Sequence, residues 1–112
     1  MTLSEQIEAA SADDERLWCE RVFEAVWPQP FLKGLYEWNR KKRSFTNKLN
    51  AHAYLDAAMM LVPDGWRNTE FYEHDDGGVL WGLRRERGVG LVGEAANPAL
   101  ALLSAIAKAR GL

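Results

Sequence analysis

The chain has 112 residues, which suits one small domain and is too short for two domains with a catalytic cleft between them. Its net charge of −2 excludes a strong overall attraction to nucleic acid or to anionic lipid. A single cysteine excludes an internal disulfide, and no run approaches the ~20 apolar residues of a membrane span, so a cytoplasmic protein is expected.

Residues 3–27 are predicted to form an N-terminal helix. Its apolar side chains recur at helical spacings, and the larger ones are Leu17, Trp18, Val22, Phe23 and Val26. No glycine or proline intervenes before Pro28. Ser11 followed three positions later by Asp14 resembles a capping box, which allows a break near residues 10–11.

Residues 28–48 are predicted to be a long, partly irregular connection with at most one short helical turn. Pro28 and Pro30 end the preceding helix, because proline lacks the backbone donor and clashes with the turn before it. Gly34 and the basic run at 40–43 then show no clear period. A loop of this length is uncommon and is usually functional or mobile.

Residues 49–112 are predicted to form the core, which begins with a helix over 49–62. Leu55, Ala58, Met59 and Val62 form the apolar stripe of this helix. Pro63-Asp64-Gly65 ends it, since glycine supplies the left-handed conformation that such a turn requires.

Three short strands follow over residues 66–72, 79–84 and 89–93, where β-forming residues alternate with others. Consecutive strands joined by short loops are antiparallel, so the sheet is a meander. Asn97 and Pro98 form a strong helix start, and the broad apolar face of 98–110 must be buried on this sheet. The predicted fold is therefore a single α+β domain over residues 1–112.

Three segments show a resemblance to a known family. These are "LDAA" at 55–58, "LVPDGW" at 61–66 and "ANPALAL" at 96–102, and "CERVFEAVWP" at 19–28 fits more loosely. In these segments the chain resembles the phage ABA sandwich family, whereas its residues 29–48 depart from that pattern. The resemblance implies an α/β/α-type sandwich encoded by a phage or prophage. It implies no activity, so no catalytic residue is carried over.

The stretch "EHDDGG" at 73–78 is the densest group of catalytic-type side chains. A histidine nitrogen and carboxylate oxygens are legitimate ligands for zinc or a hard cation. Neighbouring residues on an extended segment point to opposite faces, however, so Glu73, His74 and Asp75 do not converge easily. Asp76-Gly77-Gly78 is typical of a hairpin turn, which is the interpretation we favour.

Other catalytic arrangements are weaker still. His52 and His74 lie in separate elements and show no ligand spacing. Cys19 lies between Trp18 and Val22 on the first helix, where a buried and unreactive thiol is the ordinary outcome. We therefore expect no enzyme activity, no cofactor and no metal site.

The basic run Arg40–Arg43 is the sharper feature, because Tyr36, Trp38 and Phe45 flank it. Cations beside rings are typical of proteins that bind nucleic-acid backbones and stack bases. A second basic cluster, whose position relative to the first is open, comprises Arg84, Arg85 and Arg87. The other interpretation is a solvated charge run that balances the acidic N-terminal helix, and the net charge of −2 and the short length of the run favour it over nucleic-acid binding.

A third interpretation of the same region is a surface for a protein partner or for self-association. Its apolar residues require burial against something, and they are Trp27, Phe31, Leu32, Leu35 and Trp38. The function that we expect is that of a non-catalytic accessory or protein-interaction domain, with no membrane and no small-molecule substrate. The expected contact residues are Trp38, Arg40, Lys41, Lys42 and Arg43. The alternative is nucleic-acid binding through residues 36–45.

Overall fold

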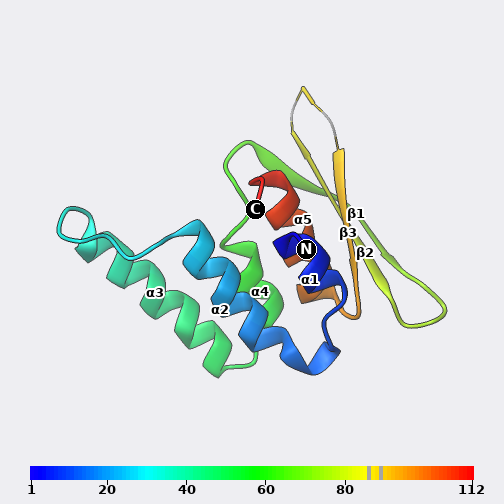
Figure 1. Ribbon diagram of the computed structural model, residues 1–112, viewed down its shortest axis with the longest axis horizontal. Helices are drawn as coiled ribbons and strands as arrows, with labels where there is room; N and C mark the ends of the chain where they lie inside the picture. The colour runs from blue at the N-terminus through cyan, green and yellow to red at the C-terminus, as the bar shows by residue number, and fades with distance from the viewer. Residues whose placement is uncertain (86, 89) are drawn as a thin grey trace.

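The computed structural model describes every residue from 1 to 112 except Glu86 and Val89. Within these residues it combines five α-helices with a three-stranded antiparallel sheet, which confirms the predicted α+β class (Figure 1). None of the described helices is both long and apolar enough to cross a membrane.

The N-terminal segment is divided into three pieces. These are α1 (Leu3–Glu8), the 3-10 turn η1 (Ala12–Asp14) and α2 (Glu15–Val26). A capping box of Thr2 and Glu5 starts α1, and the Ser11 hydroxyl accepts the N–H of Asp13 at 3.4 Å. The single helix predicted over 3–27 is thus interrupted where the sequence allows a break.

A long helix, α3 (Leu35–Asn50), occupies most of the segment predicted to be irregular, so that prediction is wrong over these residues. Trp38, Lys42, Phe45 and Leu49 lie at the i, i+4, i+7 and i+11 positions that face the protein. Lys42 therefore interrupts the apolar stripe, and a charged residue at this position conceals the helical period in the sequence.

The next helix, α4 (Tyr54–Met59), is shorter than the predicted 49–62. Leu49 belongs to α3, and the chain turns at His52, whose φ is 59°. After Met59 the chain tightens into i→i+3 hydrogen bonds, such as Leu61 N–H to the carbonyl of Ala58. Two short elements therefore replace one amphipathic helix.

The sheet is the predicted meander, in the order β1 (Trp66–Glu73), β2 (Val79–Arg85), β3 (Gly90–Ala95). Trp81 on β2 lies between Phe71 on β1 and Gly93 on β3. The β1–β2 register shifts between Asn68 and Glu70, which makes Thr69 a bulge residue. The sequence "RRERG" at 84–88 also predicts a hairpin-like turn between β2 and β3, and this prediction lies partly outside the described residues.

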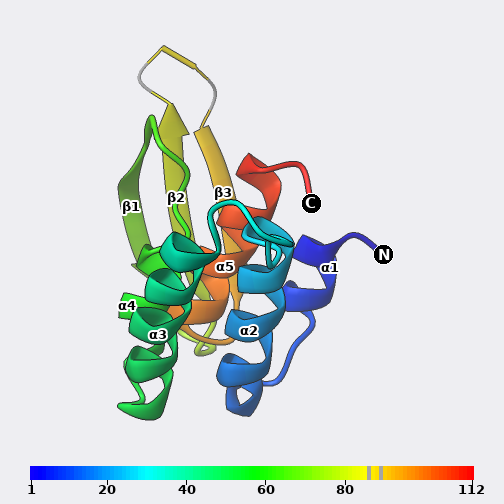
Figure 2. The same ribbon diagram turned by 90° about the vertical axis from the view of Figure 1, so that its left-hand side faces the viewer.

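The last helix, α5 (Pro98–Ala109), is the centre of the fold (Figures 1 and 2). Every residue from 99 to 107 is buried, because β2 and β3 cover one side of the helix and α1, α2 and α4 cover the other. The sheet therefore forms one outer layer, α5 and α1 lie directly on it, and α2, α3 and α4 form a further layer on the same side (Figure 1). Among the described residues, no helix covers the opposite face of the sheet (Figure 1).

Candidate interaction surface

The predicted contact residues all lie on α3, the helix farthest from the sheet (Figure 1). They do not share one environment, because a helix turns about 100° per residue and distributes a consecutive run around its surface. Trp38 lies on the inner side, Lys41 and Lys42 on the flank beside α2, and Arg40 and Arg43 on the exposed side.

Trp38 is part of the packing and not a free contact residue. Its indole Nε1 donates a hydrogen bond of 2.7 Å to the carbonyl oxygen of Trp27, at the end of α2. Its ring meets Phe23 nearly edge-on, with 6.1 Å between the centroids. Trp38 therefore attaches α3 to α2, and the expectation that it binds a partner is not supported by its position.

Lys41 and Lys42 place their cations over aromatic rings of α2. The Lys41 ammonium lies 4.5 Å from the Trp27 ring centroid, and that of Lys42 lies 4.7 Å from the Phe23 ring centroid. Such cation–π contacts stabilise a pair by about 0.5–1 kcal/mol at partly exposed sites. Both lysines therefore contribute to the contact between α2 and α3 while keeping their charge at the surface.

Arg40 and Arg43 are the cations directed to solvent. The Arg40 side chain is 66% exposed, and its nearest carboxylate, that of Glu37, is 3.9 Å away. An exposed pair at this distance contributes little, so Arg40 is available for another anion. Arg43 is exposed one turn further along the helix.

Large exposed side chains lie at the connection between α2 and α3, before these cations in the chain. Phe31 is 91% exposed, Leu32 is 76% exposed and Tyr36 is 73% exposed. We call Phe31, Leu32 and Tyr36 the apolar tip. The sequence indicated Phe31 and Leu32 as residues that need burial, but not that they would stand free at the end of a helix pair.

The loop that carries Phe31 and Leu32 of the apolar tip is held in place at both ends. Pro28 and Pro30 restrict its backbone, and Gly34 enters α3 with a φ of 86°, which glycine adopts without strain. At its base, the Trp27 carbonyl is bonded to Trp38 and the Trp27 ring packs against Phe23 at 5.3 Å. Phe31 and Leu32 are therefore presented on a braced loop, and a preorganised loop loses less conformational entropy in any contact than a mobile one.

The electrostatics of this region differ from those of the whole chain. Residues 33–50 contain six lysine and arginine residues against one glutamate, a net charge of +5 in a chain whose net charge is −2. A local excess of this size attracts an acidic surface despite the negative total.

The "EHDDGG" segment forms the predicted hairpin turn. The N–H of His74 donates to the carbonyl of Gly78 at 2.7 Å, and the N–H of Gly77 donates to the carbonyl of His74 at 3.0 Å. The Asp76 carboxylate accepts the N–H of Gly78 at 3.0 Å. Asp76 thus stabilises the turn itself, which is the usual role of this residue type.

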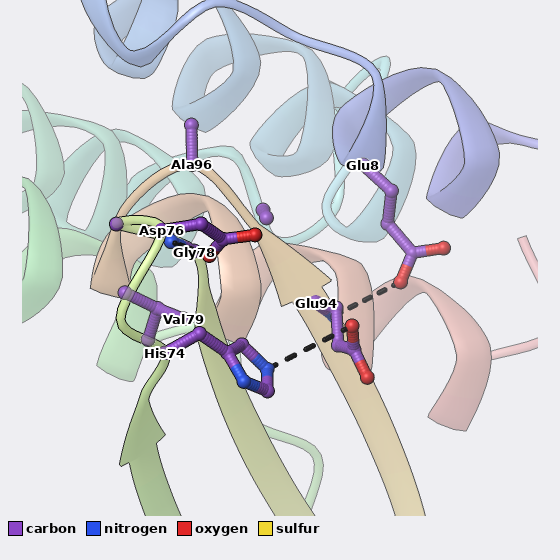
Figure 3. A pocket seen from close by; sticks show the side chains of 9 residues that line it. Glu8, His74, Asp76, Gly78, Val79, Glu94 and Ala96 are labelled. Atoms are coloured by element: carbon purple, nitrogen blue, oxygen red, sulfur yellow. Dashed lines mark hydrogen bonds and ion pairs between the residues drawn. The ribbon is translucent and has the colours of Figure 1, made fainter.

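An open cleft of about 480 Å³ lies between this turn, β3 and α1 (Figure 3). His74 Nε2 is 4.0 Å from Glu94 Oε2, and Glu8 Oε2 accepts the backbone N–H of Glu94 at 2.9 Å. Glu8 is already engaged by Lys108 at 3.2 Å. Among the described residues no three histidine, cysteine or acidic side chains converge as a metal site requires.

The other candidate residues lie apart from one another. His52 is exposed after α3, with its ring 5.7 Å from that of Tyr54, whereas His74 belongs to the hairpin. Burial raises the pKa of the Cys19 thiol to about 12, and Glu15 and Glu20 add to the effect. This thiol is therefore protonated at neutral pH, as expected of an unreactive cysteine. Arg84 and Arg85 end β2, on the sheet and away from α3 (Figure 1).

No protein-family model matches the chain, and comparison with curated proteins and with solved structures finds no match. Nothing in these comparisons links the chain to the phage ABA sandwich family, so that resemblance stays a prediction from the sequence.

Proposed function

We propose that the protein is a non-catalytic interaction protein that binds a partner protein through the apolar tip and the exposed cations Arg40 and Arg43. The observation that carries the proposal is the exposure of Phe31 and Leu32 on a braced loop. Exposed apolar side chains that gather at one place on a soluble protein are typical of a docking site. The phage or prophage context implied by the resemblance belongs to this proposal.

The partner that fits this surface has an apolar pocket beside an acidic rim. The tip would fill the pocket, while Arg40 and Arg43 would meet carboxylates at its edge. In such interfaces a few buried aromatic and arginine side chains carry most of the affinity, and the surrounding contacts exclude water.

The proposal is tested by capture of partners with three variants. Phe31→Ser with Leu32→Ser removes the two loop side chains of the tip, and Arg40→Ala with Arg43→Ala removes the cations. Arg67→Ala with Arg84→Ala, on the sheet, is the matched control for lost charge. Because all six side chains are exposed, we expect unfolding free energies within about 0.5 kcal/mol of the parent.

A partner that is recovered by the parent and the control, and is lost from both the tip variant and the cation variant, supports the proposal. Recovery of the same proteins by the tip variant as by the parent contradicts it. The change in the dissociation constant of the recovered complex with salt concentration then measures how much Arg40 and Arg43 contribute to the affinity.

Nucleic-acid binding is the second candidate, and the net charge of +5 over residues 33–50 favours it. Of the three rings that flank the cations, however, only Tyr36 is exposed, because Phe45 is fully buried and Trp38 is bonded to Trp27. Backbone contact through the cations is then the main mode that is left.

Titration with single- and double-stranded DNA and RNA over a salt series tests this candidate. Binding that weakens with a log–log slope of roughly −0.7 to −0.9 per phosphate contact, and is lost in the Arg40→Ala/Arg43→Ala variant, would favour it over the protein partner. Lys41 and Lys42 stay unchanged in this variant, because their removal also disturbs the contact with α2.

A further inference from the structure

The two edges of the sheet differ in how their backbone groups are satisfied. On β3, the outward N–H of Glu94 donates to the Glu8 carboxylate at 2.9 Å, and the outward carbonyl of Val92 accepts from the Lys108 ammonium at 2.7 Å. Side chains of α1 and α5 thus close this edge. Natural proteins cover edges in this way to prevent pairing with another strand.

The β1 edge has no such cover. This strand packs mainly against β2, and its contacts with the described helices are much fewer. It lies at the outer side of the sheet in Figure 2. Among the described residues, no side chain or loop bonds to the backbone of residues 67–73 from outside the β1–β2 ladder. Phe71 and Tyr72 on this strand are 49% and 59% exposed.

The turn identifies which backbone groups of β1 face outward. The N–H of His74 bonds to the carbonyl of Gly78, and residues of an antiparallel pair alternate between bonding to the partner and facing away. Tyr72 and Glu70 therefore bond to β2, whereas the N–H and C=O groups of Phe71 and Glu73 face away from the sheet. The same alternation places Val92 and Glu94 outward on β3, which agrees with their bonds to Lys108 and Glu8.

We propose that residues 70–74 of β1 pair antiparallel with the same residues of a second copy of this chain, with Tyr72 opposite Tyr72. This register joins Phe71 of each copy to Glu73 of the other and satisfies all the outward groups of these residues with four hydrogen bonds. It also stays clear of the Thr69 bulge, which disrupts the first half of the edge.

Charge complementarity favours a second copy as the occupant. In this register Glu70 of each copy lies opposite His74 of the other, two tyrosines face each other at the two-fold axis, and no like charges are directly opposed. A shift by one pair in one direction sets Glu73 against Glu73. A shift by two pairs in the other direction sets Glu70 against Glu70, and such pairs are destabilising.

The dimer is expected to depend on concentration. An interface of five residues from each copy buries less surface than the roughly 1,200–2,000 Å² that is buried in stable complexes. The dimer is therefore expected to be weak and transient. The pairing would join two three-stranded sheets into one of six strands, with α3 of each copy free for the partner proposed above.

The first test is disulfide trapping in a Tyr72→Cys variant, with oxidised glutathione as the oxidant. Directly opposed residues have Cβ atoms about 4.5–5.5 Å apart, so a small adjustment brings two cysteines into bonding distance. Cys19 is buried and does not compete. A Glu24→Cys variant, with its thiol exposed on α2, measures the rate of chance collisions.

We expect the covalent dimer of Tyr72→Cys to form at least ten-fold faster than that of Glu24→Cys. Equal rates in the two variants would overturn the proposal.

The second test compares Glu73→Pro with Glu73→Ala by sedimentation equilibrium. Proline deletes the outward N–H of residue 73, which has no hydrogen-bond partner among the described residues, whereas alanine retains it. We expect the dimer dissociation constant to rise at least ten-fold with proline and less than two-fold with alanine. A parent protein that stays monomeric throughout, or a dimer that proline leaves unchanged, would contradict the pairing. If Glu73→Pro fails to fold, the trapping experiment still decides.

Discussion

Gly93 determines how closely the sheet approaches α5. A Cβ atom at this position would lie 2.1 Å from the carbonyl oxygen of Ala101 and 2.6 Å from the nitrogen of Ala105. Both are backbone atoms, so no side-chain rotation relieves the contact. The small residue is what allows β3 to lie directly on the central helix.

Gly93→Ala is therefore expected to destabilise the protein by about 3 kcal/mol, at the upper end of the usual cost of overpacking, because α5 and β3 must separate. Gly90→Ala is the matched control on the same strand, since its Cβ would meet nothing closer than 3.6 Å. Urea unfolding of both variants checks the prediction. Similar midpoints for the two would show that the sheet and α5 can separate without cost.

Lys42 is the second residue whose environment decides its role. It occupies a position on α3 where an apolar residue is usual, and its stem covers Phe23 while its ammonium stays 4.7 Å from the ring centroid. We expect Lys42→Ala to lower the unfolding free energy by about 1 kcal/mol. The exposed Arg43→Ala, which removes the same charge, should change it by less than about 0.5 kcal/mol. Equal losses in the two variants would assign the effect to charge and not to packing.

At the scale of elements, the β3 edge depends on an ion pair. Partial burial acts to raise the pKa of the Glu8 carboxyl, but the N–H of Glu94 and the Lys108 ammonium outweigh it and lower the pKa below the ordinary value of 4.5. A group with a lowered pKa stabilises the fold above its ordinary pKa, and this contribution is lost as the pH falls through the folded-state pKa.

Glu8→Gln is thus expected to cost about 1 kcal/mol at neutral pH and less at about pH 3, because the parent carboxyl also gains its proton as the pH falls through its folded-state pKa. Chemical unfolding at both pH values measures the difference, with Glu24→Gln on the exposed side of α2 as control. A cost that persists unchanged in acid would mean that the charge of Glu8 is not what closes the edge.

For the whole molecule, α5 makes the helices and the sheet into one cooperative unit. It contacts β2 and β3 on one side and α1, α2 and α4 on the other, so neither part has a core without it. We expect a single unfolding transition in urea that coincides by far-ultraviolet circular dichroism and by tryptophan fluorescence. The five tryptophans lie in both the helical part and the sheet, so they report on each. Two separated transitions would contradict this prediction.

Much of the fold follows from local patterns. The alternation at Val79, Trp81 and Leu83 and the turn residues Asp76 and Gly77 predict the hairpin, because strand pleat and turn geometry depend on neighbours in the chain. Asn97 likewise caps α5, with its side chain accepting the N–H of Leu100 at 2.9 Å.

The arrangement of the candidate contact residues could be predicted only in part. The basic run is where the sequence shows it, but α3 was expected to be irregular, because Lys42 breaks its apolar stripe and favourable contact with Phe23 comes from a different helix. The sequence also could not predict which aromatic rings would be exposed. Trp38 and Phe45 pack against Phe23 of α2, whereas Phe31 and Tyr36 are exposed to solvent.

The sequence by itself determined the α+β class, the three-stranded meander, the hairpin turn at 73–78 and the helix that follows Asn97. These features depend on periodicity, capping and turn chemistry within a few residues of each other. Only the tertiary structure decided that α5 is buried on all sides, that Trp38 is a packing residue, and that Glu8 and Lys108 close one edge of the sheet while β1 stays open. Those outcomes depend on which distant elements meet, and burial between them is a property of the assembled molecule.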